Sequence, residues 1–154
     1  MNVVSQLIEN TIKTKNPSVI GLDPDIGKIP ACYKAMATTQ NPLEAVADVI
    51  YAFNRDIIDT VAPFVPAVKP QMAFYEKYGS YGVAAFEKTV AYAKSKGLVV
   101  IEDAKRNDIG NTAQAYADGH LAPLRAGEID RGLSGWDTSK DPTFFFRDNY
   151  PTAN

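Results

Sequence analysis

Three short apolar runs, separated by segments of helical periodicity, constrain the fold of this chain more than any other feature of its sequence. The runs cover residues 18–23, 65–69 and 98–101. Strands that are apolar on both faces and alternate with helices are typical of βαβ units on a parallel sheet. We therefore expect an α/β fold with buried strands at these runs. The second run is the weakest, because Pro66 lacks the amide that a sheet hydrogen bond needs.

The segments between these runs carry apolar residues three and four positions apart, which predicts amphipathic helices. Asn41 followed by Pro42 has the form of an N-cap with proline at the first helical position, and Pro63 ends the helix that begins there. Further helices are expected over residues 2–14, 71–78, 80–96 and 108–119, and a loop with at most a turn of helix over 24–41.

Composition indicates one soluble globular domain and removes several classes of function. The chain has 154 residues, of which 45% are hydrophobic and 22% charged, so disorder is not expected. The net charge of −2 provides no general attraction to polyanions. We therefore expect neither nucleic acid nor an anionic lipid surface as a partner.

The cysteine and histidine content limits both the cellular setting and the metal chemistry. Cys32 is the only cysteine and cannot form an internal disulfide, which favours a reduced, cytoplasmic location. His120 is the only histidine, so the chain offers no Cys/His zinc cluster, and we expect no metal site. The first ten residues lack the pattern of a signal peptide, and no run approaches the ~18 apolar residues of a membrane span.

Charged residues end the same face of each predicted strand. Alternation along a strand places Asp23 in line with Val19, Lys69 in line with Val65, and Asp103 in line with Ile101. Lys105 continues the third face if the chain stays extended. All of these charges fall at the carboxyl edge of the predicted sheet, where parallel α/β proteins bind ligands and gather catalytic side chains.

The segment after the third strand, residues 102–112, concentrates this charge further. Asp103, Lys105 and Asp108, with Lys69 from the preceding strand, could form an alternating chain of two ammonium and two carboxylate groups in one cleft. Burying such a set costs several kcal/mol per ion unless opposite charges touch, so a cleft of this kind is usually kept for chemistry. Flanking carboxylates would also hold Lys105 protonated, ready to act as an acid.

Each of these residues also has an ordinary structural interpretation. Asp108 could be no more than a helix N-cap before Ile109, and Lys105 with Arg106 could lie on a solvated loop. Lys69 could extend its amine to solvent beside Pro70. The coincidence of all the charges at equivalent strand ends favours the functional interpretation over these alternatives.

The segment Asp-Ala-Lys-Arg-Asn-Asp-Ile-Gly-Asn-Thr at 103–112 closely resembles the Asp-x-Lys-x-x-Asp-Ile-Gly-x-Thr motif of the orotidine 5'-phosphate decarboxylase family. Gly-Leu-Asp-Pro-Asp at 21–25 and Val-Lys-Pro-Gln at 68–71 are similar to that family's first and second strand ends, especially in its longer bacterial and archaeal-type branch. Asn107 departs mildly from the pattern, because the family often has Gly or Ala there. The resemblance runs from about residue 18 to residue 119.

The resemblance implies a (β/α)8 TIM barrel that converts orotidine 5'-phosphate to uridine monophosphate and CO2 in pyrimidine biosynthesis, without metal or organic cofactor. By motif position, Lys105 would donate a proton to the pyrimidine C6 carbon and Asp103 would lie beside the departing carboxylate. Lys69 would bridge Asp103 and the ribose, and Asp23 would bind a ribose hydroxyl.

The resemblance also implies a homodimer with shared active sites. In the family, the residues that match Asp108, Ile109 and Thr112 reach into the neighbouring subunit's site. The expected small-molecule partner is the nucleotide substrate, and the expected protein partner is a second copy of the chain.

Length is the main departure from the family pattern. A barrel of this type needs about 250 residues and eight strands, whereas only about three βα units can be placed here. We expect residues 1–120 to form the N-terminal part of the barrel domain and residues 121–154 an irregular segment or insertion before strand four. The phosphate grip of such barrels lies after strands seven and eight, so we expect this chain alone to be inactive.

Two other functions remain open at this point. One is a magnesium-dependent decarboxylase or aldolase of the same suprafamily that acts on sugar phosphates, against which Ile109 and Thr112 argue. The other is a non-catalytic fragment or dimerisation module that keeps the first part of the fold but turns over no substrate.

Overall fold

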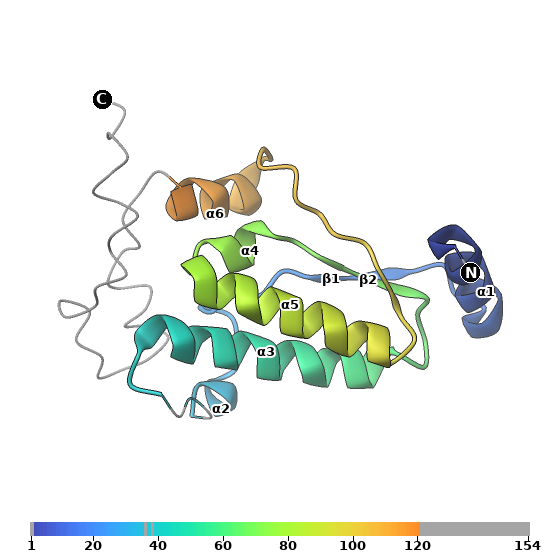
Figure 1. The fold of residues 1–154 in the computed structure, drawn as a ribbon, viewed down its shortest axis with the longest axis horizontal. Helices are drawn as coiled ribbons and strands as arrows, with labels where there is room; N and C mark the ends of the chain where they lie inside the picture. The colour runs from blue at the N-terminus through green and yellow to red at the C-terminus, as the bar shows by residue number, and fades with distance from the viewer. Residues whose placement is uncertain (1, 36, 38, 121–154) are drawn as a thin grey trace.

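A computed structural model describes residues 2–35, 37 and 39–120 of the chain and places three parallel strands in one sheet. The strands are β1 (Val19–Leu22), β2 (Ala67–Pro70) and β3 (Val99–Val100), in the order β1-β2-β3. This order and the helical crossovers between the strands confirm the predicted α/β class (Figure 1). The third strand is shorter than residues 98–101, which the sequence predicted.

Helices account for most of the remaining described residues, close to the predicted positions. They are α1 (Val3–Thr14), α2 (Ala31–Lys34), α3 (Pro42–Val61), α4 (Ala73–Glu76), α5 (Gly79–Ser95) and α6 (Gly110–His120). No helix of this described part is long and apolar enough to cross a membrane. The expected irregular segment, 121–154, lies outside the described residues.

Two prolines, Pro66 within the second run and Pro70 directly after it, lie at positions where the sheet tolerates them. Pro66 precedes β2, and its carbonyl accepts from the amide of Val99 at 3.1 Å and from the side chain of Asn10 at 3.1 Å. Pro70 is the last residue of β2, where its carbonyl still accepts from the amide of Asp103 at 3.1 Å. Both prolines therefore still accept a hydrogen bond from the neighbouring segment through their carbonyl groups, and the missing proline amide does not interrupt the pairing with β3.

The helices α3 and α5 lie side by side along one face of the sheet (Figure 1). Apolar side chains from the helices and from the covered face of the strands form a buried cluster between these layers. Its buried members are Leu22, Ile58, Val65, Val68, Ala93 and Leu98. The alternation of side chains along a strand sends every second residue into this cluster.

The opposite face of the sheet is less covered than the sequence predicted. Val19 of β1 and Ile101 beyond β3 remain 39% and 38% exposed, and Gly21 is also exposed. Buried strands on both faces were expected at these runs, and this expectation is wrong for β1. The physical reason is that α3 and α5 pack on one face only.

Different helices lie at the two ends of the parallel strands (Figure 1). α1 lies at the amino end of the strands, where Asn10 donates to the carbonyls of Pro66 and Gly97. α4 and α6 lie at the opposite, carboxyl end, packed against each other. The carboxyl end is therefore the end at which the predicted charged residues emerge.

Asn41 caps α3 as the sequence predicted, because its side-chain oxygen accepts from the amides of Leu43 at 3.0 Å and Glu44 at 3.3 Å. Replacing Asn41 with alanine leaves these two amides without that acceptor. We expect Asn41→Ala to lower the free energy of unfolding by roughly 0.5–2 kcal/mol, measured by urea denaturation. Asn41→Ser, which can still cap, should lose clearly less, and equal losses in the two variants would contradict the capping role.

Candidate active site

The sheet places Lys69 and Asp103 next to each other at its carboxyl end. Lys69 lies in β2, and Asp103 lies beyond β3 in a parallel bridge with Gln71. The backbone of Asp103 is held twice, because its amide donates to Pro70 at 3.1 Å and its carbonyl accepts from Met72 at 2.9 Å. The segments that continue β2 and β3 thus stay hydrogen-bonded, and this pairing fixes the backbone from which the Asp103 carboxylate projects.

Asp103 is the centre of a network of four charged side chains. One carboxylate oxygen lies 3.2 Å from the Lys69 amine, and the other lies 2.6 Å from the Lys105 amine. The Lys105 amine also lies 2.8 Å from a carboxylate oxygen of Asp108. Two amines and two carboxylates therefore alternate, in the order Lys69, Asp103, Lys105, Asp108. The structure brings together all four residues that the sequence predicted for this network.

Electrostatic contacts within the network stabilise the charged form of its members. The hydrogen bond from Lys105 is the main reason why the pKa of Asp103 lies below its usual value, with Lys69 adding to the effect. Lys105 and the amide of Ile109 likewise lower the pKa of Asp108. The two carboxylates in turn raise the pKa of Lys105, with Asp103 as the larger cause. At neutral pH Lys105 is therefore protonated, with both carboxylates favouring its charged form.

Asp23 lies just beyond β1 and belongs to the same electrostatic neighbourhood. Its surface is open to solvent, but contacts around the carboxyl group remove part of its hydration, and this desolvation raises its pKa. Lys69 opposes the rise, while the negative charge of Asp103 adds to it. The Asp23 side chain makes no ion pair within the described residues, so it remains available to a ligand hydroxyl.

The pKa of Asp103 gives a direct test of the network. We expect a carbon-detected NMR titration to place this pKa below the usual aspartate value of about 3.9. As pH falls through that lowered value, the carboxyl group takes up a proton and loses its ion pairs with Lys105 and Lys69. Lys105→Ala removes the largest cause of the shift and should move the pKa upward. An unchanged titration in that variant would contradict the geometry.

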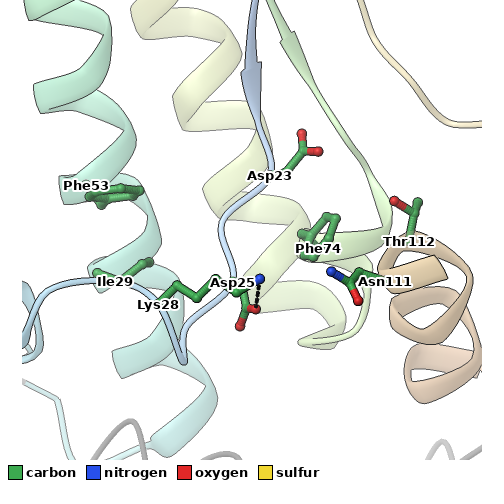
Figure 2. A pocket seen from close by; sticks show the side chains of 8 residues that line it. All are labelled: Asp23, Asp25, Lys28, Ile29, Phe53, Phe74, Asn111 and Thr112. Carbon is green, nitrogen blue, oxygen red and sulfur yellow. Dashed lines mark ion pairs between the residues drawn. The ribbon is translucent and has the colours of Figure 1, made fainter.

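A pocket of about 400 Å³ opens beside Asp23, between the loop that follows β1 and the start of α6. Figure 2 shows Asp23 at the end of the strand, Asn111 and Thr112 on α6, and the ion pair of Asp25 with Lys28 on the loop. Apolar side chains complete the lining: Ile29, Phe53 and Phe74. A polar rim over an apolar lining suits a small ligand that carries both hydroxyl groups and a ring.

The remaining predicted site residues lie near the network without joining it. Thr112 lines the pocket, whereas Ile109 is 85% exposed. The ordinary interpretation of Lys105 on a solvated loop is partly kept, because its side chain is 47% exposed although its amine is paired. The network therefore lies at the surface of the described part of the chain, and the expectation that it would be buried in one cleft is wrong. Two other ordinary interpretations do not hold alone. Asp108 bonds the Lys105 amine in addition to the neighbouring amide of Ile109, and Lys69 is paired rather than extended into solvent.

Two further contacts around the network were not predicted from the sequence. The guanidinium group of Arg106 pairs with Glu76 of α4. The side-chain oxygen of buried Gln71 accepts from the hydroxyl of Tyr116 on α6 at 2.9 Å. The sequence signals were weak: Arg106 lies inside the motif and Gln71 ends the 68–71 segment, but neither partner is near in the sequence.

The fold and the charge network together define a class of protein. A parallel sheet of βα units carries, at its carboxyl edge, a protonated lysine held between two carboxylates, as in a barrel enzyme that works by charge stabilisation and proton transfer. Among the described residues, no three His, Cys, Asp or Glu side chains gather in a way that could hold a metal ion.

Comparison with known proteins agrees with this class. A model of the orotidine 5'-phosphate decarboxylase / HUMPS family matches residues 42–127, which is more than half of the chain. The chain therefore belongs to this family. A solved structure from Streptomyces avermitilis, described as a candidate orotidine 5'-phosphate decarboxylase, superposes with a TM-score of 0.50 at 30% identity. That superposition covers 84% of this chain and 47% of the other, which confirms the predicted barrel family.

Curated relatives named orotidine 5'-phosphate decarboxylase match along most of the chain. The protein from Rhodopirellula baltica is 36% identical over 149 residues, covering 97% of this chain and 48% of the relative. The protein from Parabacteroides distasonis is 46% identical over 114 residues, covering 73% of this chain and 37% of the relative. The chain thus spans less than half of the length of these relatives.

Proposed function

We propose that this chain supplies the charge network of an orotidine 5'-phosphate decarboxylase, which converts orotidine 5'-phosphate to uridine monophosphate and CO2. The observation that carries the proposal is the Lys105 amine, fixed 2.6 Å from Asp103 and 2.8 Å from Asp108. The names of the curated relatives support the same activity. The proposed setting is the cytoplasm, and no organic or metal cofactor takes part.

The difficulty of this reaction lies in the electron pair that remains when CO2 leaves. The bond between C6 and the carboxyl carbon breaks, and both electrons stay in an sp² orbital at C6 that the ring cannot delocalise. The Lys105 ammonium, already oriented by its two carboxylates, stabilises this charge and delivers a proton to C6. Fixed charges of this kind need no reorganisation at the moment of reaction, which makes them effective in a site shielded from water.

The other network residues have distinct proposed roles. Asp103 lies beside the departing carboxylate of the substrate, and Lys69 links Asp103 to the ribose. Asp23 accepts a hydrogen bond from a ribose hydroxyl, which its lack of an ion pair within the described residues favours. The pocket beside Asp23 has room for the sugar and its ring substituent.

We also propose that two copies of the chain share their sites. Ile109 supports this proposal, because its aliphatic side chain is 85% exposed on the loop next to the site. Burying this side chain against a partner subunit would favour association. Thr112 lies one helical turn further on, at the rim of the pocket. In the proposed dimer, Asp108, Ile109 and Thr112 border the site of the neighbouring subunit, while Asp108 keeps its contact with Lys105 of its own chain.

The activity is best tested in a chimera, since the relatives are about twice as long as this chain. Residues 1–120 replace the matching residues of the Parabacteroides distasonis protein, and uridine monophosphate formation is followed in the presence and absence of a chelator. We expect turnover that the chelator does not change. Loss of activity with the chelator would favour the magnesium-dependent alternative. A folded chimera without turnover, beside an active parent protein, would favour a non-catalytic module.

A further inference from the structure

The turn that carries Lys105 and Asp108 contains a backbone conformation that arginine rarely adopts. Arg106 has a φ of +62°, in the left-handed region that disfavours residues with a Cβ atom. Asn107, which is better suited to such a conformation, does not adopt it, since the described non-glycine residues with positive φ are Lys15 and Arg106. The structure around this turn must therefore offset the backbone cost.

The Arg106 side chain makes two contacts that stabilise this turn. One nitrogen donates to the carbonyl of Ala104 at 2.6 Å, which closes the turn on itself. The other nitrogen pairs with a carboxylate oxygen of Glu76, at the end of α4. The Glu76 side chain is only 12% exposed, so its charge is more shielded from water than that of an ordinary surface pair. A planar guanidinium group that bonds two partners at once restricts the conformation of the turn more than a single hydrogen bond would.

The contacts of Arg106 fix the middle of a segment whose two ends are already held. At one end, the carbonyl of Asp103 accepts from Met72 at 2.9 Å, just before α4. At the other end, Tyr116 of α6 donates to buried Gln71 at 2.9 Å. Between these ends, the Arg106 side chain ties the turn to α4.

We propose that the Arg106–Glu76 ion pair positions Lys105 and Asp108 for their roles in the network. Lys105 is a long side chain that remains half exposed, so it has many accessible rotamers unless the backbone presents it from one place. Holding the turn at Arg106 keeps the Lys105 amine within bonding distance of both Asp103 and Asp108. Arg106 and Glu76 act through Lys105 and touch no reacting atom, so they are positioning residues. The importance of this positioning for turnover rests on the proposed function.

Hydrogen exchange on the full chain tests the ion pair directly. Arg106→Gly removes the side chain while allowing the left-handed backbone, and Glu76→Gln keeps the shape but removes the charge. We expect the hydrogen-bonded amides at the two ends of the turn, those of Asp103 and Ile109, to exchange roughly three- to tenfold faster in Arg106→Gly, with a smaller increase in Glu76→Gln. The matched control is Lys96→Ala, which breaks an exposed ion pair with Asp59 at the far end of α5 and should leave these amides unchanged.

The double variant separates a shared role from two independent ones. If Arg106 and Glu76 act as a pair, exchange in the double variant should be no faster than in Arg106→Gly. Increases that multiply would overturn the proposal, because each residue would then act through a different contact. Exchange that is unchanged in both single variants would overturn it as well.

The carboxyl pKa of Asp108 provides a readout that a purely stabilising contact would not move. In the native chain Lys105 holds this pKa below its usual value. If the turn loses its anchor, the Lys105 amine spends less time at Asp108, and the pKa should rise in Arg106→Gly and in Glu76→Gln. A pKa that stays at the native value in both folded variants would overturn the proposal. None of these readouts depends on turnover, so their failure is distinguishable from failure of the proposed decarboxylation.

Discussion

Replacing Lys105 with alanine should lower uridine monophosphate formation in the chimera by about 10²–10⁴-fold, the range typical for removal of a positioned proton donor. Among the residues that the structure describes, no other amine pairs with both Asp103 and Asp108 and could take over the proposed protonation of C6. The variant also brings two carboxylates together without their shared cation, which disfavours an anionic transition state further. Steady-state kinetics with orotidine 5'-phosphate measures the effect, which should appear mainly in kcat.

The control for this variant is another lysine with a comparable ion pair. Lys96 lies 2.6 Å from Asp59, the same separation as between Lys105 and Asp103, but it lies at the end of α5 remote from the carboxyl edge of the sheet. Lys96→Ala should leave turnover unchanged. Equal losses in the two variants would show that any broken ion pair lowers activity, and would contradict the proposed role of Lys105 as the proton donor.

Replacing Gly82 with alanine should destabilise the chain, although alanine is the better helix former. Gly82 lies within α5, where its Cα approaches the backbone of Tyr75 on α4. A Cβ atom at this position would overlap the carbonyl oxygen of Tyr75 and come within 2.9 Å of its carbonyl carbon. Because backbone cannot move aside as a flexible side chain can, we expect a loss of about 1–3 kcal/mol or more in the free energy of unfolding.

The sign of the effect at Gly82 distinguishes it from helix propensity. An exposed helical glycine gains roughly 0.5–1 kcal/mol when replaced by alanine. The matched control is Ala84→Gly, at an exposed position two residues further along the same helix, which should lose about that amount. Urea denaturation compares both variants with the native chain. A more stable Gly82→Ala variant would mean that α4 and α5 do not approach as closely as described.

The elements that the sequence predicted are those that local chemistry determines. Asn41 followed by Pro42 predicts the start of a helix, because the Asn41 side chain can cap amides only two and three residues away, and α3 begins there. The proximity of Lys69 and Asp103 was predictable because both lie at the carboxyl edge of the sheet, and alternation places them on the same face, although the register pairs Asp103 with Gln71. The network was therefore predictable in its membership, and its distances followed only from the structure.

What the sequence did not predict depends on contacts between distant segments. The partner of Arg106 lies 30 positions away on a helix of four residues, and no local pattern indicates which carboxylate it selects. The need for glycine at position 82 arises from the approach of α4, which periodicity does not encode. The exposure of Val19 likewise depends on which layers pack on each face of the sheet, and an apolar run carries no information about that.

The sparsely covered face of the sheet affects how the purified chain should behave in solution. Val19 and Ile101 present aliphatic groups to water there, beside the outer strands β1 and β3 whose outward edges pair with no other described strand. Surfaces of this kind bind fluorescent dyes such as ANS and favour self-association as concentration rises. Light scattering across a dilution series would therefore be an informative first measurement on the isolated chain, and mild detergent should reduce the scattering.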